Sequence, residues 1–211
     1  MRHFSAATIL LMLLASFQMW AGDLTPLSGA EAEKAVTTIN SANSGIKTLQ
    51  ASFEQVRESS MLAEKMVSKG KMHYKEGKLR WEYETPYPSL FILSGEQVVT
   101  SNSQGTTKRD LRSSRAFKSV ADVMMNGVTG MNMLDTSNFK VTVYSSDNGY
   151  VADLEPLKRD MKQMFKTIRL SFGADSRVSC IELVESSGKT TITLSGAKYN
   201  GAISDSVFSI D

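Results

Sequence analysis

Residues suited to catalysis are sparse in this 211-residue chain. Glu82 and Glu84 lie two positions apart, so a strand would place both carboxylates on one face, as a glycosidase needs for its acid and base. His73 is the only histidine after His3, which is too few for a catalytic triad or a histidine-rich metal site. Lys71 and neighbouring bases offer the carboxylates ion-pair partners instead, and we expect His73 in solvent. We predict no catalytic residues, no metal, no cofactor and no enzymatic activity.

The remaining reactive or charged groups also have plain structural explanations. Cys180 is the only cysteine, and its strand-like surroundings favour a half-buried side chain over a reactive thiol. Two basic clusters either form a solvated surface or contact an acidic partner or acidic lipid headgroups. The clusters are Arg109, Arg112, Arg115 and Lys118, and Lys158, Arg159, Lys162 and Lys166.

The first 22 residues have the pattern of an export signal. Arg2 and His3 precede an uncharged apolar run over residues 6–17, which matches a signal peptide and is too short to span a bilayer comfortably. Cleavage near Ala21 or Gly22 would leave one mature domain, residues 23–211, and an uncleaved anchor is the alternative. No cysteine there could accept a lipid, so we expect an exported, soluble protein.

Length and charge limit the possible partners of this domain. About 190 residues suffice for one domain with a sizeable core. Without Arg2, the chain carries 23 basic and 22 acidic side chains. A nucleic-acid-binding protein would show a strong basic excess, so we expect no nucleic acid partner.

A β-hairpin over residues 70–86 gives the clearest structural pattern. Apolar and aromatic side chains alternate with charged ones, so all of the former lie on one face. A two-residue turn at Glu76-Gly77 would pair Met72 with Trp81 and Lys71 with Glu82. A core or a ligand must cover so apolar a face.

The other elements predict a mainly antiparallel sheet. A helix should start at Ser28, with Glu31 completing a capping box, and run to about Asn43. A second helix, 114–126, should end at Gly127 as its cap. About ten strands with short turns form a meander of the kind that curls into a barrel or half-barrel. Besides the hairpin, the strands are 49–57, 89–94, 97–101, 139–145, 150–155, 164–172, 178–185, 189–195 and 207–210.

A methionine-rich stretch follows the second helix. Methionine adapts to variable apolar shapes, so these residues either fill a core or form a surface for apolar ligands. The stretch comprises Met124, Met125, Met131, Met133 and Leu134.

Several short motifs occur in a recognisable order. Phe53-Glu54-Gln55 gives F-x-Q, and Arg80-Trp81-Glu82-Tyr83 with Pro86 gives R-W-x-Y…P. Leu154–Lys158 then reads L-x-P-x-K, and Ile168–Phe172 reads I-x-L-x-F. Together with the export signal, this order resembles the periplasmic outer-membrane lipoprotein carrier family of the LolA type.

The resemblance implies a fold and a function. The family fold is an unclosed antiparallel half-barrel, here of about 10–11 strands, with a helical lid over an apolar cavity. Such a carrier receives acylated lipoproteins from an inner-membrane ABC transporter and delivers them through the periplasm to an outer-membrane receptor lipoprotein; we expect a monomer. Alternatives are a lipid- or lipoprotein-sensing regulator and a carrier of another lipid or glycolipid.

The resemblance also assigns candidate residues. The expected acyl-chain cavity is lined by Phe53, Met72, Leu79, Trp81, Tyr83, Phe91, Ile168, Leu170, Ile181 and Leu183, and the expected lid is the methionine-rich set named above. Three features depart from the family pattern. The turn at Glu76-Gly77 lacks the family's Arg-Pro, Thr100–Ser103 replaces an aromatic-Asp stretch, and we expect no C-terminal extension beyond Asp211.

Overall fold

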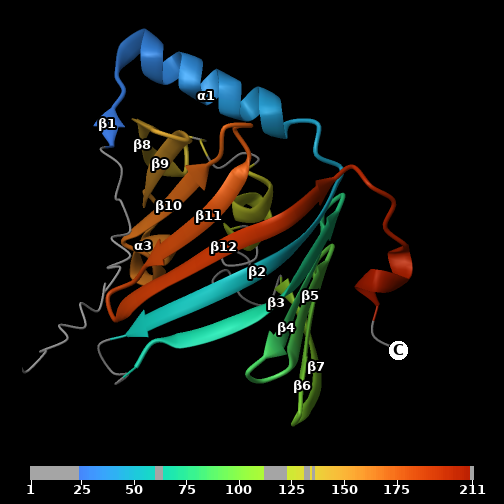
Figure 1. Cartoon of the computed structure of the whole chain (residues 1–211). Coiled ribbons are helices and arrows are strands. Elements are labelled where there is room, and N and C mark those ends of the chain that lie inside the picture. Colours follow the sequence, from blue (N-terminus) through green and yellow to red (C-terminus); the bar gives the residue numbers. More distant parts are fainter. Residues whose placement is uncertain (1–23, 60–63, 112–122, 131–133, 135, 210–211) are drawn as a thin grey trace, which may run out of the picture.

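One strongly curved antiparallel sheet forms the body of the molecule (Figure 1). The computed structural model describes residues 24–59, 64–111, 123–130, 134 and 136–209. The strand order is β1-β8-β9-β10-β11-β12-β2-β3-β4-β5-β6-β7, and the two end strands do not pair with each other. The predicted unclosed antiparallel sheet is therefore confirmed, with two strands, β1 and β7, that the sequence pattern did not predict.

The elements follow one another with short connections. The first half contains β1 (Thr25–Pro26), α1 (Gly29–Asn43), β2 (Thr48–Ser59), β3 (Met66–Lys75), β4 (Lys78–Thr85), β5 (Ser89–Ser94), β6 (Gln97–Asn102) and β7 (Gly105–Asp110). The second half contains β8 (Phe139–Ser146), β9 (Gly149–Pro156), α3 (Arg159–Met164), β10 (Thr167–Phe172), β11 (Val178–Val184), β12 (Gly188–Tyr199) and the 3-10 helix η2 (Asp205–Phe208). Residues 123–129 are also helical.

The core lies on the inner face of the sheet. Alternate residues of nearly every long strand point to this face and form one apolar cluster, as period-2 alternation requires. Helix α1 crosses one end of the curved sheet and buries Ala35, Ile39 and Asn43 there (Figure 1). The helix of residues 123–129 adds Val123 and Val128 to the same cluster.

The β3–β4 hairpin has the predicted register. Met72 pairs with Trp81 and Lys71 pairs with Glu82, and the turn residues Glu76 and Gly77 both take positive φ, of 40° and 83°. The side-chain ion pairs do not follow the backbone pairing of the two strands, because a bulge displaces Glu84 toward Lys71. Lys71 therefore pairs with Glu84, while Glu82 accepts from Arg80.

A second, smaller apolar cluster lies on the outer face of the sheet. Strand β5 is apolar on both sides, and its outward residues Leu90 and Ile92 need a cover of their own. The C-terminal strap, which we define as residues 200–209, supplies this cover by burying Ile203 and Phe208 against them. The predicted final strand at 207–210 is wrong, because residues 205–208 form η2 over this cluster.

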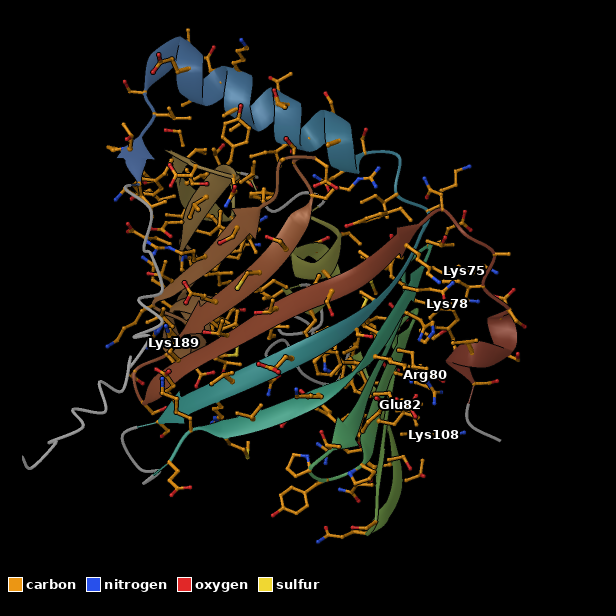
Figure 2. All side chains as sticks on the ribbon, in the orientation of Figure 1. Lys75, Lys78, Arg80, Glu82, Lys108 and Lys189 are labelled. Atoms are coloured by element: carbon orange, nitrogen blue, oxygen red, sulfur yellow. The ribbon has the colours of Figure 1, made fainter. Side chains whose placement is uncertain are left out.

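Polar contacts hold the C-terminal strap on the β3–β4 hairpin. Asp205 accepts from Lys75 at 3.2 Å and from Lys78 at 2.8 Å. The Lys75 ammonium also donates to the carbonyl of Ile203, and the Arg80 guanidinium donates to the carbonyl of Val207. Figure 2 shows the three basic residues on the side of the hairpin nearest the strap.

Three local predictions need correction. Ser28 precedes α1 but makes no side-chain capping hydrogen bond. Gly127 lies inside the helix of residues 123–129, and Gly130 with φ of +68° follows its end. Met164 ends α3, so the strand predicted from this residue begins at Thr167. The predicted helical residues 114–122 lie outside the described residues.

Removing the Phe208 ring should loosen the C-terminal strap. Phe208→Ala leaves a cavity beside Leu90 and Ile92, and we expect it to lower the free energy of unfolding by about 3 kcal/mol. Asp205→Asn should change stability little, because its ion pairs are open to solvent. Urea denaturation of both variants and the parent checks this, and equal stability of Phe208→Ala and the parent would contradict it.

Candidate ligand cavity

The structure brings the ten predicted cavity residues onto one surface. Seven of them are buried in the main apolar cluster, and Tyr83, Phe91 and Leu183 are half-buried against it. Neighbouring strands align them into rows. Met72, Trp81 and Phe91 lie side by side across β3, β4 and β5, and the pairs Leu170–Ile181 and Ile168–Leu183 lie side by side across β10 and β11.

Three aromatic side chains organise the wall formed by β2 and β4. The ring of Phe53 stacks on Trp81 with centroids 4.1 Å apart and meets the edge of Tyr83 at 5.3 Å. Gly70 stands opposite both Phe53 and Tyr83 in the sheet. A Cβ at this position would approach the Glu82 carbonyl oxygen to 1.9 Å and the Phe53 ring to 2.7 Å. Glycine therefore leaves the space into which Phe53 fits.

A cavity of about 480 Å³ lies beside this aromatic cluster. The β11–β12 turn, the end of α3 and the inner faces of β2 and β4 surround it. Trp81, Tyr83 and Leu183 of the ten predicted lining residues border the cavity. The remaining wall consists of Gln55, Met124, Gln163, Met164, Phe165, Glu185, Ser186, Ser187, Thr190 and Ile192. The other seven predicted residues contribute to the packed core.

Two of the polar side chains that line the cavity are hydrogen-bonded to each other. The Tyr83 hydroxyl donates to Gln55 Oε1 at 3.0 Å. Burial raises the pKa of Tyr83, and the hydrogen bonds from Trp81 and to Gln55 oppose that rise only in part. Tyr83 is therefore protonated at neutral pH. Trp81 is 1% exposed, and its indole N–H interacts with the Tyr83 hydroxyl at less than full hydrogen-bond geometry.

The predicted lid residues are only partly described. Met124 lines the cavity, and Met125 is half-buried against the core. Leu134 is buried in the same cluster. Met131 and Met133 lie outside the described residues. The described part of the lid thus fills the inside of the curved sheet, in contact with the strands that it was expected to cover.

Sequence reasoning missed part of this wall for specific reasons. Met164 and Phe165 follow from a short helix, α3, that was read as the start of a strand. Ile192 has an inward position on β12 that alternation predicts, but it was not assigned to the cavity. Gln55 belongs to the F-x-Q motif but was not assigned to the cavity, and Thr190 was not assigned either, because a polar residue interrupts the apolar pattern of the inner face.

One basic cluster lies close to the cavity. Lys158, Arg159, Lys162 and Lys166 are exposed on and beside α3, whose last residues line the cavity. In the other cluster, Arg109 belongs to β7, and Arg112, Arg115 and Lys118 lie outside the described residues. The α3 cluster therefore places positive charge near the cavity wall.

His73 and Cys180, whose side chains were considered for catalysis or reactivity, are both half-buried. His73 is half-buried, contrary to the prediction of a solvated residue, and burial lowers its pKa. Burial raises the pKa of Cys180, which favours the unreactive thiol. Within the described ranges, no group of His, Cys, Asp or Glu could hold a metal ion. A search of the same residues finds no helix with the length and apolarity to cross a membrane.

Known proteins resemble this chain over most of its length. The family model described as outer membrane lipoprotein carrier protein LolA matches residues 44–211. An outer-membrane lipoprotein carrier protein of Pseudomonas putida KT2440 is 26% identical over 205 residues, which cover 95% of this chain and 93% of the relative. The protein of the same name from P. putida W619 is 27% identical over 209 residues, with the same coverage.

Solved structures give weaker similarities. The LolA superfamily protein NE2245 from Nitrosomonas europaea has a TM-score of 0.47 and 11% identity, and the match covers 85% of this chain and 97% of that one. Lipoprotein LppX from Mycobacterium tuberculosis has a TM-score of 0.44 and 10% identity, covering 81% and 96%. Family membership is decided by the family-model match.

Adding a methyl group at Gly70 should disturb the aromatic wall. Gly70→Ala forces a backbone oxygen and the Phe53 ring to shift, and we expect a loss of about 3 kcal/mol in the free energy of unfolding. Gly45→Ala is the matched control, since its Cβ would meet nothing within 4 Å. Urea denaturation distinguishes the two, and equal stability of both variants would show that Phe53 does not depend on this space.

Proposed function

We propose that this chain, which belongs to the LolA family of outer membrane lipoprotein carrier proteins, binds the acyl chains of lipoproteins and carries them through the periplasm. Its partners in this role are an inner-membrane ABC transporter, which supplies the lipoprotein, and an outer-membrane receptor, which accepts it. Residues 1–22 direct export and are then removed, leaving residues 23–211 as the carrier.

The cavity beside Trp81 is the observation that carries this proposal. Its volume of about 480 Å³ lies in the usual range of small-ligand sites, and its walls are mainly apolar and aromatic. Met124 and Met164 contribute side chains that adapt to different apolar shapes. A wall of this kind can bind hydrocarbon without strong directional contacts, so it can also release it.

The energetics of lipid transfer require such a wall. Removing an acyl chain from a membrane costs about 0.8 kcal/mol for each CH₂ group. A multiply acylated lipoprotein therefore leaves its membrane only when a protein surface replaces most of that apolar environment. Transfer to the next partner then requires that the carrier hold the chains little more tightly than a membrane does.

The filled inner face implies that loading moves the helix of residues 123–129. Most of the ten proposed lining residues are already covered by other side chains, and protein cores have little free volume. A second or third acyl chain can therefore enter only where Met124, Met125 and Leu134 withdraw from the sheet. We assign these residues, with Met131 and Met133, to a lid over the strands.

A charge placed in the cavity wall should abolish acyl binding. Leu183 is suitable because it is half-buried and lines the cavity, whereas Leu79 and Trp81 are buried too deeply for a charge to leave the fold intact. We expect Leu183→Asp to co-purify from the periplasm with at least tenfold less acylated protein than the parent. Mass spectrometry of the co-purifying material provides the measurement.

Leu157→Asp is the matched control for this experiment. Leu157 is 47% exposed and does not line the cavity, so its replacement should leave acylated cargo unchanged. Equal cargo on Leu183→Asp and the parent would contradict the proposed site. Free lipid without acylated protein on the parent would indicate a carrier of another lipid, and a non-acylated protein partner would indicate a regulator.

A further inference from the structure

Exposed positive charge gathers on and beside α3. Lys158, Arg159, Lys162 and Lys166 are all exposed, and none of the four forms an ion pair with a carboxylate of the described residues. Several lysines of β3 and β8, by contrast, pair with carboxylates of neighbouring strands. Like charges held close together repel one another, so the α3 cluster favours the approach of an anion.

This charge borders a hollow that adjoins the ligand cavity. The hollow has a volume of about 570 Å³ and is lined by Lys158, Arg159, Asp160 and Gln163. Gln163 also lines the cavity, so the two spaces meet at this side chain. Asp160, the acidic member of the hollow, accepts from the Met161 N–H at 3.0 Å. An apolar space and a basic one therefore share a border on α3.

We propose that the cavity and the hollow together bind a phospholipid with a net negative headgroup, with an acyl chain in the cavity and the phosphate against Lys158 and Arg159. This inference rests on the proposed acyl-chain cavity and adds a ligand class to it. The acylated end of a lipoprotein carries no phosphate, so the basic hollow offers a contact that this cargo does not use.

The chemistry of the two spaces favours such a lipid. The guanidinium of Arg159 and the ammonium of Lys158 can donate charge-assisted hydrogen bonds to phosphate oxygens. Among the described residues that line the cavity, only Glu185 is charged, and its carboxylate disfavours an anion inside the cavity. The headgroup therefore belongs outside it, at α3. A zwitterionic headgroup would also bring a cation toward Lys162 and Lys166, which repel it.

The shared border also distinguishes a lipid from an acidic protein. An acidic protein could pair with the α3 cluster, but it would make no use of the apolar space that begins at Gln163. A molecule with both a hydrocarbon chain and an anionic group fills both spaces at once. Hydrocarbon burial then supplies most of the affinity, and the hollow selects the headgroup.

Two lipids with identical chains test this selection. Dioctanoyl phosphatidylglycerol is anionic, whereas dioctanoyl phosphatidylcholine carries the same phosphate with a compensating cation. Displacement of a neutral fluorescent fatty-acid ester from the protein purified from the periplasm reports both affinities. We expect phosphatidylglycerol to bind about five- to tenfold more tightly, a modest preference because exposed ion pairs each contribute little. In 1 M salt, which screens charges beyond about 3 Å, the preference should fall below about twofold.

Charge reversal at the hollow should remove the preference. Lys158→Glu combined with Arg159→Glu alters no residue of the cavity wall, so this variant should bind the neutral ester as the parent does and bind the two lipids equally. Lys34→Glu combined with Lys198→Glu is the matched control. It changes the net charge by the same amount at exposed positions on α1 and β12, and α1 lies away from α3 (Figure 1). The control should keep the preference.

The outcomes separate the hollow from the cavity. Equal affinity of the parent for the two lipids, or a preference that persists in the α3 variant, would overturn this inference and leave acyl binding standing. A preference lost equally in both variants would overturn it too, because net charge alone would then select the lipid. Failure of the parent to bind the neutral ester and both lipids would overturn the proposed function and this inference with it.

Two further measurements identify the other possible sources of binding. Glycerophosphoglycerol, the same headgroup without chains, should displace no ester at the same concentration, and displacement by it would show that the anion alone binds. Loss of lipoprotein cargo by the α3 variant, with its lipid preference unchanged, would overturn the inference by assigning the cluster to an acidic protein partner.

Discussion

The pairing of β12 with β2 is the constraint on which the whole architecture depends. These strands come from opposite ends of the described chain, yet they pair from Gly188–Ser59 to Tyr199–Leu49. Each half of the molecule is otherwise a separate meander, β2–β7 or β8–β12, with an open edge. Only their union gives a sheet long enough to curl around the helix of residues 123–129, and it places Gln55 and Ile192 side by side in the cavity wall.

The incomplete closure of the sheet matters as much as its curvature. A closed barrel of about eight strands has an interior that strand side chains fill alone, whereas this sheet has twelve strands. Here the end strands stay apart, and the helix of residues 123–129 occupies the inside of the sheet with Val123 and Val128 in the core. The interior is thus shared between a rigid wall of hydrogen-bonded strands and a helix held mainly by apolar contacts. The position of this helix can therefore change without breaking the hydrogen bonds between the strands.

Local patterns predicted most of the strands because turn chemistry and alternation agree there. The two-residue turn at Glu76-Gly77 fixes the pairing of Met72 with Trp81, so this register can be predicted without any long-range contact. Contacts between distant parts of the chain determine the features that local patterns did not predict. The tail at Val207 looks like a strand by composition, but Leu90 and Ile92 on the outer face demand a cover, and η2 provides it. The sequence predicted a cavity lined by ten apolar residues. Its actual position depends on Phe165 and the β11–β12 turn, and no local sequence pattern indicates that these two lie together.

The C-terminal strap has a consequence for any chain that lacks it. Ile203 and Phe208 cover an apolar patch that the preceding strands leave exposed. A chain that ends before Ile203 can still form every strand of the sheet, but it presents Leu90, Ile92 and Val99 to water. Exposed apolar surface of this kind favours aggregation and recognition by quality-control proteases. The strap therefore protects the sheet by covering this patch.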